Sequence, residues 1–198
     1  MKVRLLGTAA GGGLPQWNCA CAGCVAARRA GVNRTQDCLA VTGDGSAWYL
    51  VNASPDLRTQ LIAAPELAPG PGLRDTPVRG VLCSTGELDH TLGLITLREA
   101  ASLQIYATAP VRAALEGPFP AGPILSRYTT VEWHDVVPGA WMNLDGGLRS
   151  SYPGQQGSAT LPFQCPDKTK PNTHSFTLTV KGHAGATKTV TATAKPNP

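Results

Sequence analysis

The chain of 198 residues carries a formal net charge of +4 and is 42% hydrophobic, which suits one domain or one domain with an appendage. It contains no run of about 18 apolar residues, so no transmembrane helix is predicted. The apolar run at the N-terminus is too short to predict a signal peptide. We therefore expect a cytoplasmic protein with reduced cysteines. The positive charge comes mostly from lysines after residue 150, where Phe176 is the one interleaved aromatic residue, which disfavours nucleic-acid binding.

The first predicted strand, residues 3–6, leads into a glycine turn and then a cysteine motif. The turn is Gly11-Gly12-Gly13, and the motif is a C-x-C-x-x-C pattern formed by Cys19, Cys21 and Cys24. Three thiolates this close can converge on one soft metal ion, with a fourth ligand from elsewhere. The turn can also cradle an anion with its N–H groups. It lacks the Lys-Ser/Thr pair of a nucleotide loop, which favours a plain tight turn.

A short helical turn is predicted over residues 26–30, followed by a hairpin. The two strands of the hairpin, residues 38–42 and 48–52, are joined by Gly43-Asp44-Gly45, a strong turn signal. A helix is then expected up to about residue 64, with Ser54 as its N-cap and a proline as its first residue. The proline-rich residues that follow predict a loop.

The pattern then alternates apolar strands with helices. Residues 80–83 are typical of a buried strand, and a helix opens at Glu87. Further strands are predicted over residues 103–106 and 130–133 and around Trp141, and a helix over residues 108–115. Beyond residue 150, residues 176–180 and 190–193 alternate like strands. This order predicts a mixed α/β sandwich rather than an all-parallel sheet.

Candidate metal ligands follow two of these strands. Asp89 and His90 come after the strand at residues 80–83, and open α/β sheets place their ligand sites at the carboxyl ends of strands. With Glu87 they supply hard ligands for zinc or iron. The alternative is that the two carboxylates only complement the dipole of the helix that begins there. Asp56, which follows the strand ending at Asn52, has the same two interpretations.

The scattered cysteines and histidines predict no further site. The cysteines are expected to be small buried apolar residues: Cys38, Cys83 and Cys165. The histidines lie in polar surroundings and are expected at the surface: His134, His174 and His183.

Six segments before residue 150 carry long and unusual motifs: residues 6–19, 34–36, 50–58, 88–94, 97–99 and 106–112. Together they resemble the coenzyme PQQ synthesis protein B family of the metallo-β-lactamase superfamily, over residues 1 to about 148. The resemblance implies the α/β fold of that superfamily, an αββα sandwich, with the N-terminal half complete here. It also implies that Cys19, Cys21 and Cys24 hold a structural zinc.

The resemblance also locates an active-site metal. The H-x-H-x-D-H motif of the superfamily falls on residues 85–90, where Asp89 and His90 survive and the two leading histidines are replaced by Thr85 and Glu87. The family typically has an acidic residue at the first position, so Thr85 departs from the family as well. Asp89 and His90 are therefore implied as ligands of an iron or zinc.

The activity implied is a metal-dependent, oxygen-using hydroxylation of the tyrosine in a crosslinked Glu–Tyr precursor of pyrroloquinoline quinone (PQQ). The catalytic residues would be Asp89, His90 and Glu87. The substrate-binding residues, taken from the matched motifs, would be Asn52, Asp56 and Arg98. The implied partners are the precursor or PQQ itself and other proteins of PQQ biosynthesis, with no nucleic acid and no membrane span.

The resemblance stops near residue 150, which predicts a first domain over residues 1–150 and a divergent Thr/Lys/Pro-rich segment over 151–198. Arginine gives way to lysine at the same point, which suggests a foreign or out-of-frame tail. In members of the family, the C-terminal half of the chain carries a second set of metal-binding histidines. Here the candidates for the fourth zinc ligand are weak: Asp37, Cys38, His174 and His183.

Two other functions stay open. A phosphodiesterase of the same superfamily would share the glycine turn and the cysteine zinc site, but Thr85 and Glu87 stand where a two-metal clamp needs histidines. A non-catalytic remnant, or a carrier that transports PQQ or its precursor, would need no active-site metal. A sheet cut in half would expose an edge and an apolar face, which predicts self-association into a homo-oligomer.

Overall fold

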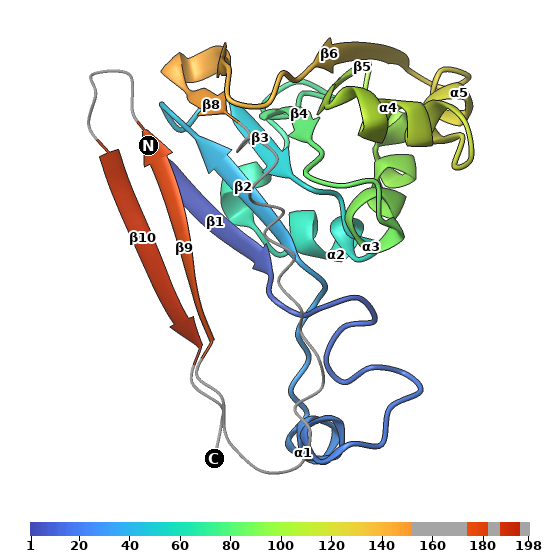
Figure 1. Ribbon diagram of the computed structural model, residues 1–198, viewed down its shortest axis with the longest axis vertical. Helices are drawn as coiled ribbons and strands as arrows, with labels where there is room; N and C mark the ends of the chain where they lie inside the picture. Colours follow the sequence, from blue (N-terminus) through green and yellow to red (C-terminus); the bar gives the residue numbers. More distant parts are fainter. Residues whose placement is uncertain (152–173, 182–186, 195–198) are drawn as a thin grey trace.

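A six-stranded mixed sheet organises the part of the chain that the computed structural model describes, which is residues 1–151, 174–181 and 187–194. The strands follow one another across the sheet in chain order (Figure 1): β1 (Lys2–Gly7), β2 (Cys38–Thr42), β3 (Trp48–Val51), β4 (Val78–Leu82), β5 (Ser102–Ala107) and β6 (Thr130–Asp135). β1, β2 and β3 pair antiparallel, and β3 to β6 pair parallel. The predicted mixed sheet is confirmed.

The hairpin between β2 and β3 forms where the glycines predict it. Asp44 closes the turn, because its Oδ1 accepts hydrogen bonds from the N–H groups of Ser46 (2.8 Å) and Ala47 (3.1 Å). These bonds, those from Ser46 first, hold the pKa of the Asp44 carboxyl below its usual range. Gly45 adopts φ +94°, a left-handed conformation that glycine takes without steric cost.

Helical segments connect the parallel strands and cover one face of the sheet. Because successive right-handed crossovers that advance in one direction fall on the same side, the helices form one layer. They are α2 (Leu57–Ile62), η1 (Pro65–Leu67), α3 (Leu88–Thr91), η2 (Leu92–Glu99), α4 (Ala109–Glu116) and α5 (Ala121–Leu125). Leu57, Leu94, Leu115 and Leu125 are fully buried in one cluster with strand residues such as Ile105. This layer and the sheet are the α and β layers expected of half a sandwich.

The opposite face of the sheet carries a second, smaller core. Side chains alternate between faces along a strand, so Tyr49 and Tyr106 point away from the helices and pack with Val136, Leu144 and Leu148. The cover is formed by β7 (Trp141–Asn143), η3 (Asp145–Gly147) and β8 (Arg149–Ser151). β9 (His174–Lys181) and β10 (Thr187–Ala194) form a separate antiparallel pair over the two segments predicted as strands.

Helix α1 (Ala22–Ala30) lies apart from the other helices, beyond the end of β1 in Figure 1. It begins directly after Cys21 and ends at Gly31, which adopts the left-handed C-cap conformation (φ 64°), with Arg28 and Arg29 in its last turn. The helical turn predicted from residue 26 therefore starts earlier and contains Cys24.

Two predicted helices differ from the structure in detail, and one helix was not predicted. α2 begins at Leu57 with Asp56 at the N-cap position, two residues later than predicted; Ser54 Oγ accepts from the N–H of Asp56 (3.3 Å), as an N-cap would, and donates to Gln60 Oε1 (2.9 Å). The helix predicted from Glu87 is one turn of α-helix followed by the 3₁₀ segment η2, and α5 has no counterpart in the prediction. No helix in the described ranges is both long enough and apolar enough to cross a bilayer.

Candidate functional site

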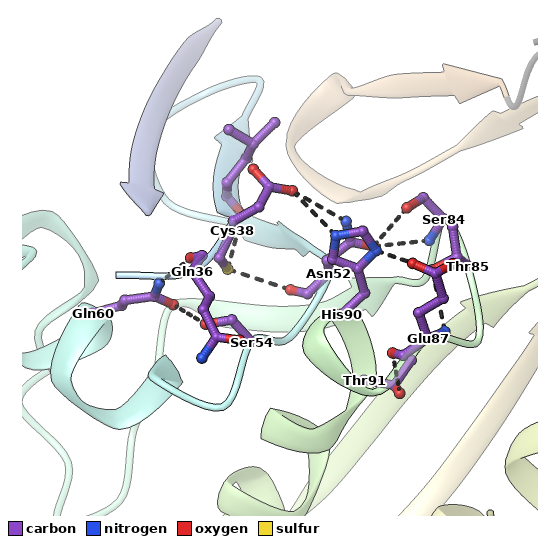
Figure 2. Close-up of polar contacts among 12 residues, drawn as sticks. Gln36, Cys38, Asn52, Ser54, Gln60, Ser84, Thr85, Glu87, His90 and Thr91 are labelled. Atoms are coloured by element: carbon purple, nitrogen blue, oxygen red, sulfur yellow. Dashed lines mark hydrogen bonds and ion pairs between the residues drawn. The ribbon is translucent and has the colours of Figure 1, made fainter. Parts of the chain in front are cut away.

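The candidate site lies where β3 and β4 end, at the carboxyl edge of the parallel part of the sheet. Asn52, directly after β3, is 4% exposed and adopts a left-handed conformation (φ 66°), which asparagine tolerates better than most residues. Its Oδ1 accepts from the N–H (3.0 Å) and the hydroxyl (2.8 Å) of Ser84, two residues past the end of β4 (Figure 2). Asn52 therefore connects the ends of β3 and β4 at the candidate site.

The segment carrying His90 is docked on the loop after Asn52. The N–H of Ala53 donates to the carbonyl of His90 (2.6 Å), and the carbonyl of Ala53 accepts from the N–H of Gly93 (2.9 Å). A Cβ at Gly93 would overlap the carbonyls of Ala53 and Ser54, so only glycine allows this approach. The Thr91 hydroxyl donates to the Glu87 carbonyl (2.7 Å), which holds the turn of α3.

The two ring nitrogens of His90 have different neighbours. Nδ1 lies 3.0 Å from Thr85 Oγ1, within hydrogen-bond distance, as Figure 2 shows. Nε2 lies 3.8 Å from Asp37 Oδ2, beyond it. Asn52 Nδ2 donates to the same Asp37 oxygen at 3.5 Å. Burial raises the pKa of the Asp37 carboxyl, and the charge of His90 acts in the opposite direction.

Glu87, Asp89 and His90 come together as the sequence predicted that they would. One potential ligand atom from each lies within 4.8 Å of the others. Asp89 is also in contact with the glycine turn, because a Cβ on Gly11 would stand only 3.0 Å from its Oδ2. Two carboxylates and an imidazole are a donor set that suits zinc or iron, so the residues present fit the expected metal.

Cys19, Cys21 and Cys24 form a second potential metal site. Their sulfur atoms lie within 4.8 Å of one another, while tetrahedral zinc with Zn–S bonds of about 2.3 Å needs separations of about 3.8 Å. The Arg28 guanidinium of α1 donates to the carbonyls of Cys19 (2.6 Å) and Gln16 (2.5 Å) and closes the loop. Burial raises the pKa of the Cys24 thiol, a cost that binding of the thiolate to a cation would offset.

The described residues do not supply a fourth ligand from the weak candidates. Asp37 faces His90, and the Cys38 thiol donates to the Asn52 carbonyl (3.4 Å). The side chains of His174 and His183 lie outside the described residues. Within the described part of the chain, no further Cys, His or carboxylate joins the group of three cysteines at the same mutual distance.

Two of the predicted substrate-binding residues have structural contacts of their own. Asp56 Oδ2 accepts from the backbone N–H (2.9 Å) and the side-chain amide (3.3 Å) of Gln36. Gln36 in turn accepts a hydrogen bond from Gly12 N at its Oε1 (3.1 Å), and Gly13 N donates to the Ala10 carbonyl (3.0 Å), so these two N–H groups of the glycine turn already have partners within the protein. Arg98 pairs with Glu99 (3.5 Å) and lies over the ring of Tyr128. Asn52 alone of the three borders the His90 group.

The scattered residues divide between confirmed and wrong predictions. Cys38 and Cys83 are fully buried, as expected, and burial raises the pKa of both thiols to about 12; Cys165 lies outside the described residues. His134 is not a free surface residue: its ring stacks on Tyr106 (4.4 Å between centroids), and its Nε2 is buried. The sequence offered Asp37 only as a candidate ligand of the cysteine zinc and Thr85 only as a replaced motif position; their contacts with His90 were missed because they depend on tertiary structure.

Residues 47–195, more than half of the chain, match the family model described as the β-lactamase superfamily domain. The chain belongs to the β-lactamase superfamily. Superfamily relatives include coenzyme PQQ synthesis protein B of Azoarcus sp. (strain BH72), 43% identical over 167 residues that cover 82% of this chain and 53% of the relative. The protein of the same name from Methylobacterium nodulans is 52% identical over 171 residues, which cover 85% of this chain and 53% of the relative.

A solved structure shows the same similarity. The crystal structure of Zn²⁺-bound PqqB from Methylobacterium extorquens superposes with a TM-score of 0.68 at 37% identity, covering 75% of this chain and 54% of that one. The resemblance to this family and the metallo-β-lactamase fold are thus confirmed. The chain spans about half the length of the curated relatives it matches. The family-model match continues past residue 150, and the proposed boundary at that residue stays a prediction.

Proposed function

We propose that this chain acts in PQQ biosynthesis, in a metal-dependent, oxygen-using hydroxylation of the tyrosine moiety of the crosslinked Glu–Tyr precursor. The observation that carries the proposal is the convergence of Glu87, Asp89 and His90 at the carboxyl edge of the sheet. This group occurs in a chain similar to coenzyme PQQ synthesis protein B over most of its length.

Asp89 and His90 would hold the active-site metal. An iron bound there would supply the redox chemistry that oxygen activation needs. The residues of the chain have separate tasks: Thr85 fixes the orientation of the His90 ring, Gly11 allows the Asp89 carboxylate to lie against the glycine turn, and Glu87 is exposed. A carboxylate on the open side of the group is placed to accept the proton of a phenol.

The cysteine group would hold a structural zinc. Its ligands come from one loop and the first turn of α1, and the Arg28 hydrogen bonds hold that loop in place without a metal ligand of their own. Three thiolates fill three of the four positions of a tetrahedral zinc, and a fourth ligand would close the site as in other structural zinc sites. Its task would be to hold the loop that continues from the glycine turn against Asp89.

The geometry disfavours a two-metal phosphodiesterase. Such enzymes clamp the attacking and leaving oxygens between two ions, which needs a second full ligand set. Thr85 stands at the first position of the superfamily motif, and its hydroxyl contacts His90 Nδ1 and accepts the N–H of Glu87 (3.3 Å). With these two contacts, Thr85 is placed to orient His90 rather than to bind a second metal ion.

Metal analysis of the purified full chain tests the proposal. We expect zinc at the cysteine group and a second metal after anaerobic reconstitution with Fe²⁺. Cys21→Ser should lose the zinc and keep the second metal, and His90→Ala should do the reverse. Hydroxylation of the crosslinked precursor should require the second metal. Stoichiometric zinc with no second metal under any reconstitution would overturn the proposal, and PQQ binding without turnover would favour the carrier role.

A further inference from the structure

Asp37 is a carboxylate beside His90 that no part of the proposed function uses. It lies directly before β2, and its side chain is 35% exposed. Its Oδ2 faces His90 Nε2 at 3.8 Å and the amide of Asn52 at 3.5 Å. It stands at the Nε2 side of the ring, outside the group of three residues whose ligand atoms lie within 4.8 Å of one another.

The contacts of His90 determine which nitrogen is available to a metal. A metal-bound histidine typically donates its other N–H to a fixed acceptor. Thr85 Oγ1, 3.0 Å from Nδ1, can serve as that acceptor, and in the tautomer that carries the proton on Nδ1 the Nε2 lone pair is available to the metal. Nε2 is the atom that faces Asp37.

The distance of 3.8 Å between His90 Nε2 and Asp37 Oδ2 indicates which interactions the two groups can make. It is too long for a direct hydrogen bond between an imidazole and a carboxylate. Two ligands of one zinc or iron ion, with bonds of about 2.0–2.2 Å, stand at most about 4.4 Å apart. The spacing of Nε2 and Oδ2 is therefore compatible with two ligands of one ion, and it excludes a direct hydrogen bond between them.

We propose that Asp37 supplies a carboxylate ligand to the metal held by His90 Nε2, with Asn52 orienting Asp37 and Thr85 orienting His90. The proposal rests on the proposed metal site at Asp89 and His90. Asn52, buried and bonded to Ser84, is held firmly enough to orient Asp37.

Cobalt binding tests the proposal without recourse to activity. The full chain is first given one equivalent of zinc to fill the cysteine group and then titrated anaerobically with Co²⁺, whose visible absorption reports the ligand set. Asp37→Asn keeps the shape of the side chain and removes its charge. We expect it to weaken Co²⁺ binding at least about 10-fold and to change the visible spectrum. Asp37→Ser provides a second variant if the first does not fold, and thermal melting of the metal-free proteins checks folding.

Glu66→Gln is the matched control, because Glu66 is 34% exposed and 3.4 Å from its cationic partner Arg4. It should bind Co²⁺ like the original chain, and His90→Ala should not bind it. Unchanged affinity and spectrum in Asp37→Asn would overturn the role of Asp37 alone and show an ordinary pairing with the imidazolium. Absence of Co²⁺ binding in the original chain, or full binding in His90→Ala, would overturn the proposed metal site and this inference with it.

Discussion

The cysteine group between Cys19 and Cys24 draws its members from one loop and the first turn of α1, whereas the group around His90 draws on residues before β2, after β3 and after β4. The three cysteines lie within six residues of one another in the sequence, so loss of a metal bound to them should change the structure only near α1. The second exists only when three strand ends meet, so it depends on the sheet. The two groups therefore differ in what holds them together: the first depends on sequence spacing and the second on the fold of the sheet.

Removal of the cysteine zinc should have the largest effect on stability. We expect Cys21→Ser, or a chelator, to lower the free energy of unfolding by about 4 kcal/mol when zinc is present at 1,000 times its dissociation constant. Urea unfolding with and without zinc measures this difference. The original chain should gain stability from zinc and the variant should not. Loss of the second metal in Cys21→Ser would show that the two regions are not independent.

Asn52→Ala should disturb the His90 group and leave the cysteine group intact. Alanine loses the buried hydrogen bonds to Ser84 and is unfavourable in the left-handed conformation, so we expect a loss of about 2 kcal/mol of stability. Asn52→Gly removes the same bonds without the conformational strain and should lose less. Equal losses in the two variants would contradict the role of the backbone conformation. Urea unfolding with zinc bound gives both values.

Thr85→Val should weaken the second metal without a comparable change in stability. Valine keeps the shape of the side chain but cannot accept the hydrogen bond of His90 Nδ1–H, and loss of such a partner typically weakens metal binding about 10-fold. Anaerobic Co²⁺ titration of the zinc-loaded chain measures the affinity. Thr85→Ser, which keeps the hydroxyl, should bind like the original chain. Equal affinity in Thr85→Val would mean that Thr85 does not orient the ligand.

Substitution of Asp44, which belongs to neither metal group, should have the smallest effect on stability. Its folded pKa is held below its unfolded value of about 3.9, so its contribution to stability is present above about pH 4 and is lost as the pH falls through the folded pKa. Asp44→Ala should therefore be less stable than the original chain at neutral pH, and the difference should shrink in acid. Urea unfolding at several pH values checks this, with metal content unchanged throughout. A difference independent of pH would contradict the assignment.

The predicted strands agree with the structure because apolar runs and glycine turns are short-range signals. The runs at residues 38–42 and 103–106 became β2 and β5 with at most one added residue at each end. The errors lie where tertiary contacts decide. The helix after β3 starts at Leu57, two residues later than an N-cap at Ser54 predicts, and His134 has polar neighbours in sequence but stacks on Tyr106.

The sequence by itself determined the superfamily, the cysteine group and the association of Asp89 with His90, because these depend on residues a few positions apart. Only the tertiary structure decided that Asp37 faces His90 from 53 positions earlier in the chain, that Thr85 contacts Nδ1, and that Gly11 touches Asp89. The physical reason is that pairing of β2, β3 and β4 brings their ends together. No local pattern records which side chains meet there.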